Sequence, residues 1–248
     1  MGKVSDFLQL VAKPGAINSR NLRVKAERKS EALAKFLSGT QILEEVISPV
    51  NGKVQVVRSL GLGTYIQAEG LTQSGGIMES VWGKPLKKTK NQKPKIKNIL
   101  ILGLGGGTAA KLVRKYWPYT KITGVDLDPI MVNLGKKYLG LDKLDVKVVI
   151  DDAYNFLKNS KFHIPNSIFD LILVDLYVGD KFPEKFESEN YIQLIRSVLA
   201  SDGVAVFNRL YWGEKRPKAM RFLKKLEKNF KNVDVVYPEA NIMFICSK

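Results

Sequence analysis

The sequence is poor in the residues that build disulfide frameworks and metal centres. Its 248 residues include one cysteine, Cys246, and one histidine, His163. A single cysteine excludes an internal disulfide framework. A single histidine leaves neither a zinc-binding cluster nor a histidine-based proton relay. We therefore expect no resident metal ion.

Long apolar runs are also missing. No run approaches the roughly 20 residues that a membrane-spanning helix needs. The apolar stretch Phe7–Val11 is too short and too interrupted for a signal peptide. Asp6 breaks the myristoylation pattern that would begin at Gly2. These absences predict a soluble, cytoplasmic protein that makes no contact with a membrane.

Acidic residues are outnumbered. The chain has 40 Lys and Arg against 24 Asp and Glu, a net charge of +16, and a pI of about 9.7. A polyanionic partner such as RNA or DNA is one explanation. A generally lysine-rich composition is the other, and we favour it because no run interleaves arginine with aromatic residues. A nucleic-acid partner stays open without being favoured.

What the sequence does contain is centred on Asn98–Asp128. Ile99–Leu102 is an unbroken apolar run, as expected for a parallel strand that is buried on both faces. Thr108–Trp117 has helical spacing, and Ile122–Val125 reads as a second strand. Between the first strand and the helix stand four glycines: Gly103, Gly105, Gly106 and Gly107.

This arrangement predicts a site for a nucleoside cofactor. Glycines let the backbone turn sharply and approach a ligand without a side chain in the way, and the helix that follows offers free amides and the positive end of its dipole. Asp126 stands at the end of the second strand, about 20 residues past the glycines, where a carboxylate can accept the hydroxyl groups of a ribose. The alternative is a glycine-rich turn with a purely structural role.

Before this core we expect two smaller parts. Residues 1–46 read as a helical segment and residues 47–90 as a small antiparallel β unit, with strands at Lys53–Arg58 and Thr64–Glu69. The run Ile77–Trp82 closes that unit, and the lysine-rich stretch Lys84–Lys97 reads as a solvated linker.

From residue 91 to residue 248 strands alternate with helices, which predicts an α/β domain with a mostly parallel, seven-stranded sheet. Val233–Val236 and Asn241–Cys246 read as a closing hairpin, which would place an antiparallel strand on that sheet. The remaining predicted strands are Val146–Ile150, Phe169–Val174 and Gly203–Phe207.

The sequence resembles the Rossmann-like class I methyltransferase fold and, within it, the spermidine synthase family of polyamine aminopropyltransferases. The likeness covers roughly Ser48 to Asn208. It is carried by these stretches: Gly70–Thr72, Leu104–Gly107, Val125–Asp128, Asp152–Leu157, Phe169–Asp175, Phe182–Phe186 and Asp202–Val204.

The resemblance implies a site at the carboxyl ends of the strands. Gly103–Gly107 would face the amino-acid or propylamine part of the donor, and Asp126 would hold the ribose. Asp152 and Ala153 would meet the adenine. Asp175 would line the place where donor and acceptor meet, covered by the loop Tyr177–Phe186. Each acid could instead cap the helix or turn that follows it.

The chain departs from the family pattern at the donor tail and the acceptor. Thr108 stands where the family has an aspartate that disfavours the carboxylate of S-adenosylmethionine, so a like-charge penalty is removed. Val178 stands where the family has its catalytic base. The family's Tyr-His-Glu run has no counterpart in Ile77–Trp82, and Asp180, Glu184 or Glu79 would have to supply the missing acid.

We therefore expect a spermidine synthase-like enzyme that binds S-adenosylmethionine and transfers methyl to an unidentified nucleophile, such as the amine of a small molecule. Asp175, Asp180 or Tyr177 would orient or deprotonate that acceptor. The alternatives are aminopropyl transfer from decarboxylated S-adenosylmethionine to a diamine, and a binding module without catalysis. An NAD-dependent enzyme fits least, because Thr108 replaces the third glycine. The resemblance also implies a homodimer.

Overall fold

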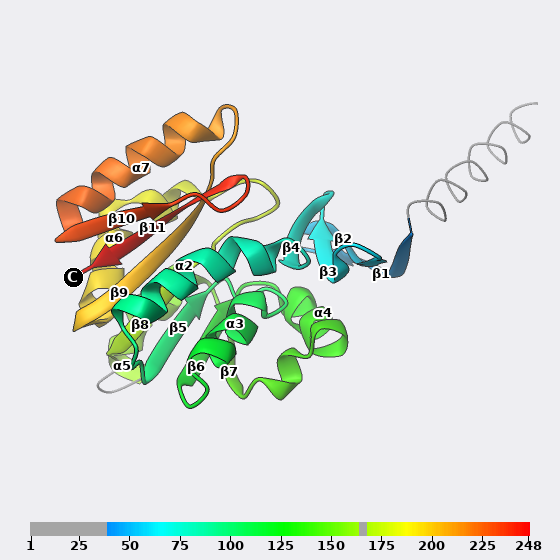
Figure 1. Ribbon diagram of the computed structural model, residues 1–248, viewed down its shortest axis with the longest axis horizontal. Helices are drawn as coiled ribbons and strands as arrows, with labels where there is room; N and C mark the ends of the chain where they lie inside the picture. Colours follow the sequence, from blue (N-terminus) through cyan, green and yellow to red (C-terminus); the bar gives the residue numbers. More distant parts are fainter. Residues whose placement is uncertain (1–38, 164–167) are drawn as a thin grey trace, which may run out of the picture. The chain divides into compact units, whose positions relative to one another are not determined.

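A computed structural model describes residues 39–163 and 168–248 (Figure 1). The chain divides into the units Met1–Gln41 and Ile42–Lys248. Residues 1–38 of the predicted helical segment lie outside the described residues. The prediction of helix up to residue 46 is wrong, because Thr40–Ser48 forms strand β1. Its Leu43 and Val46 pack against a core that includes Met131 and Leu134, a contact with distant residues that local spacing does not reveal.

The small sheet has four strands in the order β1-β2-β3-β4. The other three are β2 (Gly52–Ser59), β3 (Gly63–Ala68) and β4 (Leu71–Gly75). The predicted hairpin is confirmed, since β2 and β3 pair antiparallel. Val54, Val56 and Ile66 on one face of this sheet pack against Met131 and Leu134 of helix α4 (Pro129–Leu139).

A carboxylate ties the small sheet to the start of α4. Asp128 is fully buried and caps the helix by accepting from the amide of Ile130 at 2.9 Å. Its other oxygen accepts from Ser48 Oγ at the end of β1, at 2.5 Å, and from Asn51 Nδ2 in the turn before β2, at 2.7 Å. Hydrogen bonds to a buried charged group contribute about 1.5–3 kcal/mol each, so this contact anchors the sheet.

Two predictions for the segment after β4 are wrong. The run Ile77–Trp82 is not part of the β unit, and Lys84–Lys97 is not a linker throughout, because helix α2 spans Met78–Gln92. Its buried residues recur every three to four positions, at Val81 and Trp82, at Pro85 and Leu86, and at Thr89. The lysines occupy the outer face, so composition concealed an amphipathic helix.

The large sheet has seven strands in the order β10-β11-β9-β8-β5-β6-β7. All neighbours pair in parallel except β11, which is antiparallel to both β9 and β10. This confirms the predicted fold class, including the C-terminal antiparallel hairpin. The strands are β5 (Asn98–Leu102), β6 (Lys121–Asp126), β7 (Val146–Ile150), β8 (Phe169–Val174), β9 (Leu199–Leu210), β10 (Asn232–Val236) and β11 (Asn241–Ser247).

Helices cover both faces of this sheet (Figure 1). In β5, Ile99 and Ile101 join one core with α2 and α3, whereas Leu100 and Leu102 join the other with α5, α6 and α7. This alternation explains why β5 reads as a continuous apolar run. The covering helices are α3 (Thr108–Tyr116), α5 (Ala153–His163), α6 (Glu189–Val198) and α7 (Lys215–Asn229). Short 3-10 turns follow α4 and precede α6: η1 (Leu141–Lys143) and η2 (Glu184–Glu187).

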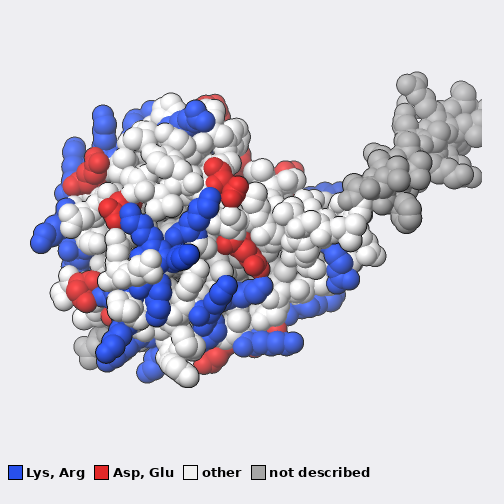
Figure 2. Space-filling view, viewed as in Figure 1, with Lys and Arg blue, Asp and Glu red and all other residues white. Residues whose placement is uncertain are grey.

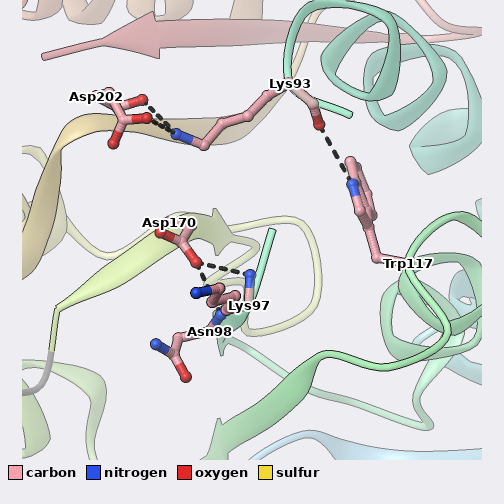
Figure 3. A network of polar contacts seen from close by, with 6 residues as sticks. All are labelled: Lys93, Lys97, Asn98, Trp117, Asp170 and Asp202. Carbon is pink, nitrogen blue, oxygen red and sulfur yellow. Dashed lines mark hydrogen bonds and ion pairs between the residues drawn. The ribbon is translucent and has the colours of Figure 1, made fainter. Parts of the chain in front are cut away.

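The amino edge of the sheet is fixed by polar contacts to the backbone (Figure 3). One carboxylate oxygen of Asp170 accepts from the amides of Lys97 and Asn98, at 2.7 and 2.9 Å. Lys93 pairs with Asp202 at 2.6 Å. These contacts hold the start of β5 against β8 and β9, at the edge opposite the loops described next.

Candidate active site

The carboxyl edge of the large sheet contains a cavity of about 420 Å³. The bend after β5 forms one wall, with Gly103, Leu104 and Gly105 among the lining residues. Gly103 has a φ of 87°, which favours glycine, and a Cβ there would overlap the carbonyl oxygen of Asp175. The ends of β5 and β8 therefore approach each other more closely than a side chain at position 103 would allow.

The other two glycines of the bend do not line the cavity. The amide of Gly106 donates to Ser74 Oγ at 2.7 Å, and a Cβ at Gly106 would crowd Ile66, Leu139 and Ser74. Gly107 has a φ of 92° and lies against Leu141. The bend thus has two parts, one open to the cavity and one that packs on the small sheet and on the end of α4.

Asp126 lies where the sequence predicted it, at the end of β6 and in the cavity wall. Its Oδ2 accepts from the amide of Gly105 at 2.6 Å, and its Oδ1 accepts from the amide of Asp128 at 2.8 Å. Burial raises the pKa of Asp126 above its ordinary value of 3.8, while the two amide hydrogen bonds oppose that rise. The carboxylate is therefore held in one orientation beside the glycine bend.

Asp152 and Ala153 also line the cavity. Asp152 caps helix α5, because its Oδ1 accepts from the amides of Tyr154 and Asn155 at 3.0 and 3.2 Å. Its Oδ2 pairs with Lys185 Nζ of η2 at 2.6 Å, so a lysine occupies the oxygen for which the resemblance implied a contact with adenine. Asp152 is thus both a helix cap and a residue of the cavity wall.

Asp175 follows β8 and is held by two neutral donors. Trp82 Nε1 donates to its Oδ2 at 2.8 Å, and Asn208 Nδ2 donates to its Oδ1 at 2.7 Å. Asn208 is in turn fixed by Asn241 Nδ2, which donates to its Oδ1 at 2.8 Å. Burial raises the pKa of Asp175, and the two hydrogen bonds counter that effect. No cation contacts this carboxylate among the described residues, so its charge is balanced by dipoles alone.

The two other predicted catalytic residues are placed differently. Tyr177 lines the cavity, but its hydroxyl accepts from the amide of Leu210 at 2.7 Å, and burial raises its pKa. A tyrosine whose anion is disfavoured in this way is a poor base. Asp180 does not line the cavity and pairs with Lys215 at 2.7 Å, which lowers its pKa. It connects the loop after β8 to the start of α7.

The acids considered as substitutes lie outside the cavity as well. Glu79 projects from α2 toward α3, where it pairs with Lys111 at 2.7 Å. Neither Glu79 nor Glu184 is among the lining residues, whereas Val178 is. On the acceptor side, Asp175 is thus the predicted acid that remains in the site.

The cavity is acidic although the protein is strongly basic. The charged side chains that line it are five acids and one lysine: Asp126, Asp151, Asp152, Asp175, Glu239 and Lys185. The described ranges contain no group of three or more His, Cys, Asp and Glu side chains with the geometry of a metal site. This potential favours a positively charged organic ligand.

Sequence reasoning missed Trp82 and Asn208, which hold Asp175. Asn208 had a usable signal, since a polar residue near the end of a parallel strand lies at the same edge as Asp175. No sequence signal pointed to Trp82, because its segment was assigned to the β unit. The same reasoning also missed Ser74, whose hydroxyl accepts from the glycine bend.

Comparison with known proteins settles the family. A model for the spermine/spermidine synthase domain matches residues 86–243. The chain belongs to this family. A Drosophila melanogaster eEF1A lysine and N-terminal methyltransferase homolog is 31% identical over 137 residues, which cover 52% of this chain and 20% of that protein. Polyamine aminopropyltransferase 1 of Hyperthermus butylicus is 29% identical over 163 residues, covering 62% of this chain and 55% of that protein.

The chain therefore spans less than two thirds of the length of these relatives. Among solved structures, a spermidine synthase in complex with the transition-state analogue AdoDATO superposes with a TM-score of 0.70. That comparison covers 84% of this chain and 74% of the other, at 19% identity. At this identity the likeness establishes the fold, and the fold agrees with the family assignment.

Proposed function

We propose that the cavity binds S-adenosylmethionine and that the chain is a methyltransferase acting on an amine. One observation carries this: the Asp126 carboxylate is fixed by the amides of Gly105 and Asp128, beside the open part of the glycine bend. Each of its oxygens keeps a further lone pair, so the pair can accept both hydroxyl groups of a ribose. The family assignment and the methyltransferase and aminopropyltransferase relatives support the same donor class.

The cavity suits the charge of this donor at both ends. Its five acids favour a cationic sulfonium, and Gly103 and Gly105 leave room beside it. Thr108 lines the wall at the start of α3 and accepts from the amide of Gly75 at 2.6 Å. The positive end of the α3 dipole would therefore face the carboxylate of a bound donor without an opposing aspartate.

Within this site we assign the proton transfer to Asp175. S-adenosylmethionine, when bound, supplies a methyl group activated by a positively charged sulfur. Asp175 would orient the acceptor amine and accept its proton, and its raised pKa makes it a stronger base than an ordinary carboxylate. Catalysis would otherwise come from holding donor and acceptor in line.

Isothermal titration calorimetry with S-adenosylmethionine and with its decarboxylated form tests the donor. We expect tighter binding of the intact donor, and a loss of about tenfold or more for Asp126→Ala. Asp142→Ala, which changes an exposed acid on η1, is the matched control. Equal donor affinity in Asp126→Ala and wild type, both folded by thermal melting, would overturn the proposal.

Aminopropyl transfer is the second candidate, favoured by the similarity to a polyamine aminopropyltransferase. Incubation with putrescine and the decarboxylated donor, followed by product analysis, tests it directly. Preference for the decarboxylated donor together with spermidine formation would replace our assignment. Tight donor binding without turnover on any acceptor would favour a binding module.

A homodimer and a cytoplasmic location stay predictions. None of the helices in the two described ranges combines the length and apolar character that crossing a membrane requires. Size-exclusion chromatography with light scattering measures the oligomeric state, and a monomer at working concentration would contradict the first prediction.

A further inference from the structure

Large apolar side chains are exposed around the mouth of the cavity. Five residues both line the cavity and are between 37% and 49% exposed: Leu71, Ile77, Leu127, Val178 and Trp212. They come from β4, the turn before α2, and the loops that follow β6, β8 and β9. Exposed apolar groups gathered from such distant segments mark an interaction surface. We call these five residues the apolar rim.

The acceptor side of the cavity has few free carboxylates that could bind the second ammonium group of a diamine. A free diamine needs one acid for the reacting amine and another for its distal charge. Glu79 and Asp180 pair with Lys111 and Lys215 instead. Glu239 does line the cavity, but it accepts from Ser80 Oγ at 2.7 Å and lies 3.7 Å from Lys84 Nζ. The acceptor side therefore offers Asp175 to one amine and apolar surface to what surrounds it.

Basic side chains border the rim. Lys84 is exposed on α2, which starts directly after Ile77. Arg216 and Lys218 are exposed in the first turn of α7, which follows Trp212 closely. Figure 2 shows Lys and Arg side chains gathered over the part of this face that α2 crosses in Figure 1. A partner that covers the rim would meet positive potential beyond it.

We propose that the acceptor is a primary amine on a protein segment, with apolar residues next to the amine and acidic residues beyond them. This rests on the proposed function for the reaction, while the docking surface stands on the rim itself. In the transfer, the acceptor nitrogen forms the new bond to the methyl carbon. The sulfur keeps the electron pair of the broken bond, and Asp175 takes the proton of the nitrogen.

Fluorescence anisotropy tests the docking surface without the donor. The probe is a labelled peptide with a free amino terminus, leucines beside it and glutamates beyond. We expect saturable binding of the peptide. Its affinity should fall about tenfold in the double variant Ile77→Ser with Trp212→Ser, and also in the double variant Lys84→Glu with Arg216→Glu. Leu60→Ser/Leu62→Ser, at exposed apolar residues outside the cavity, and Lys121→Glu/Lys143→Glu are the matched controls and should not change it.

A transfer assay with methyl-labelled S-adenosylmethionine completes the test. We expect label in this peptide, and about tenfold less in one with lysines in place of glutamates. Label in putrescine but not in the peptide would overturn the proposal. Binding of single-stranded RNA at Lys84 and Arg216, without binding of the peptide, would also overturn it. A dimer that dissociates when the rim residues are substituted would overturn it as well.

The two proposals fail in different ways. If peptide binding fails while calorimetry shows donor binding, the proposed function stands and the protein acceptor is ruled out. If the peptide binds at the rim while calorimetry shows no donor binding, the docking surface stands and the proposed function is ruled out.

Discussion

The indole nitrogen of Trp82 lies 2.8 Å from Oδ2 of Asp175, so a residue of α2 holds the acid that follows β8. The two residues are 93 positions apart in the chain. Trp82 is itself fully buried, so its ring has no freedom to follow a moving carboxylate. The contact fixes one oxygen of Asp175, and Asn208 fixes the other.

Trp82→Phe should raise the pKa of Asp175 further, because the charged form loses a hydrogen-bond donor. Such a bond to a charged group is worth about 1.5–3 kcal/mol, which corresponds to roughly one pH unit or more. NMR titration of the Asp175 carboxyl carbon measures it. Trp117→Phe removes a buried indole that donates to Lys93 O instead, and it should leave the titration unchanged. An unaltered Asp175 titration in Trp82→Phe would show that the contact has no electrostatic effect.

Gly103→Ala should destabilise the fold severely, because its Cβ would overlap the carbonyl oxygen of Asp175 at a φ of 87°. Gly140→Ala has a similar φ of 74° but open space around the added carbon. We expect about 1–2 kcal/mol for Gly140→Ala, from backbone strain alone, and clearly more for Gly103→Ala. Urea denaturation compares the two. Equal losses of unfolding free energy in the two variants would mean that β5 and β8 separate easily at their carboxyl ends.

Asp170→Ala should lower the free energy of unfolding by about 1–3 kcal/mol, because the amides of Lys97 and Asn98 lose their acceptor. Affinity for S-adenosylmethionine should stay unchanged, since Asp170 lies at the opposite edge of the sheet. Asp202→Ala at the same edge removes an ion pair whose acid is 80% exposed, and it should cost at most about 1 kcal/mol. Urea denaturation and calorimetry on both variants give the two quantities. A weaker affinity for S-adenosylmethionine in Asp170→Ala would contradict the expectation that the amino edge of the sheet does not affect the cavity at its carboxyl edge.

Asp180 should make stability depend on acid pH. Lys215 holds the pKa of Asp180 below its ordinary value of 3.8. An acid whose pKa is lowered by folding adds stability that is present above its unfolded value and is lost as pH falls through its folded value. The melting temperature of Asp180→Asn should therefore lie below that of wild type at neutral pH, and the difference should shrink as pH falls below 3.8. Asp142→Asn serves as the exposed control, and a gap that widens in acid would reverse the assignment.

Local pattern was enough for the large sheet, because β5 and β8 contain the buried apolar runs Ile99–Leu102 and Leu171–Val174. Each run is followed by a glycine or a polar residue, and β6 likewise ends at Asp126. The resemblance to the spermidine synthase family implied one site for Asp126, Asp152 and Asp175, and all three line the same cavity. The carboxyl ends of parallel strands meet at one edge.

Pattern failed where contacts are made between distant segments. Helix α2 was hidden by its lysines, and with it the Trp82 contact. The ion pairs of Asp180 and Glu79 depend on Lys215 and Lys111, which no local motif connects to them. The division of the glycine bend into an open part and a packed part likewise depends on Ser74, 32 positions away from Gly106.

Asp126 and Asp128 are two positions apart, yet one faces the cavity while the other anchors Ser48 and Asn51. Three consecutive residues thus form part of the ligand wall and also fasten the small sheet. Loosening the β1–β2 turn would free Asp128, and the amide of Asp128 is what steadies Oδ1 of Asp126. The proposed nucleoside affinity and the packing of the first strands are in this way thermodynamically coupled, so selection on either would also act on the other.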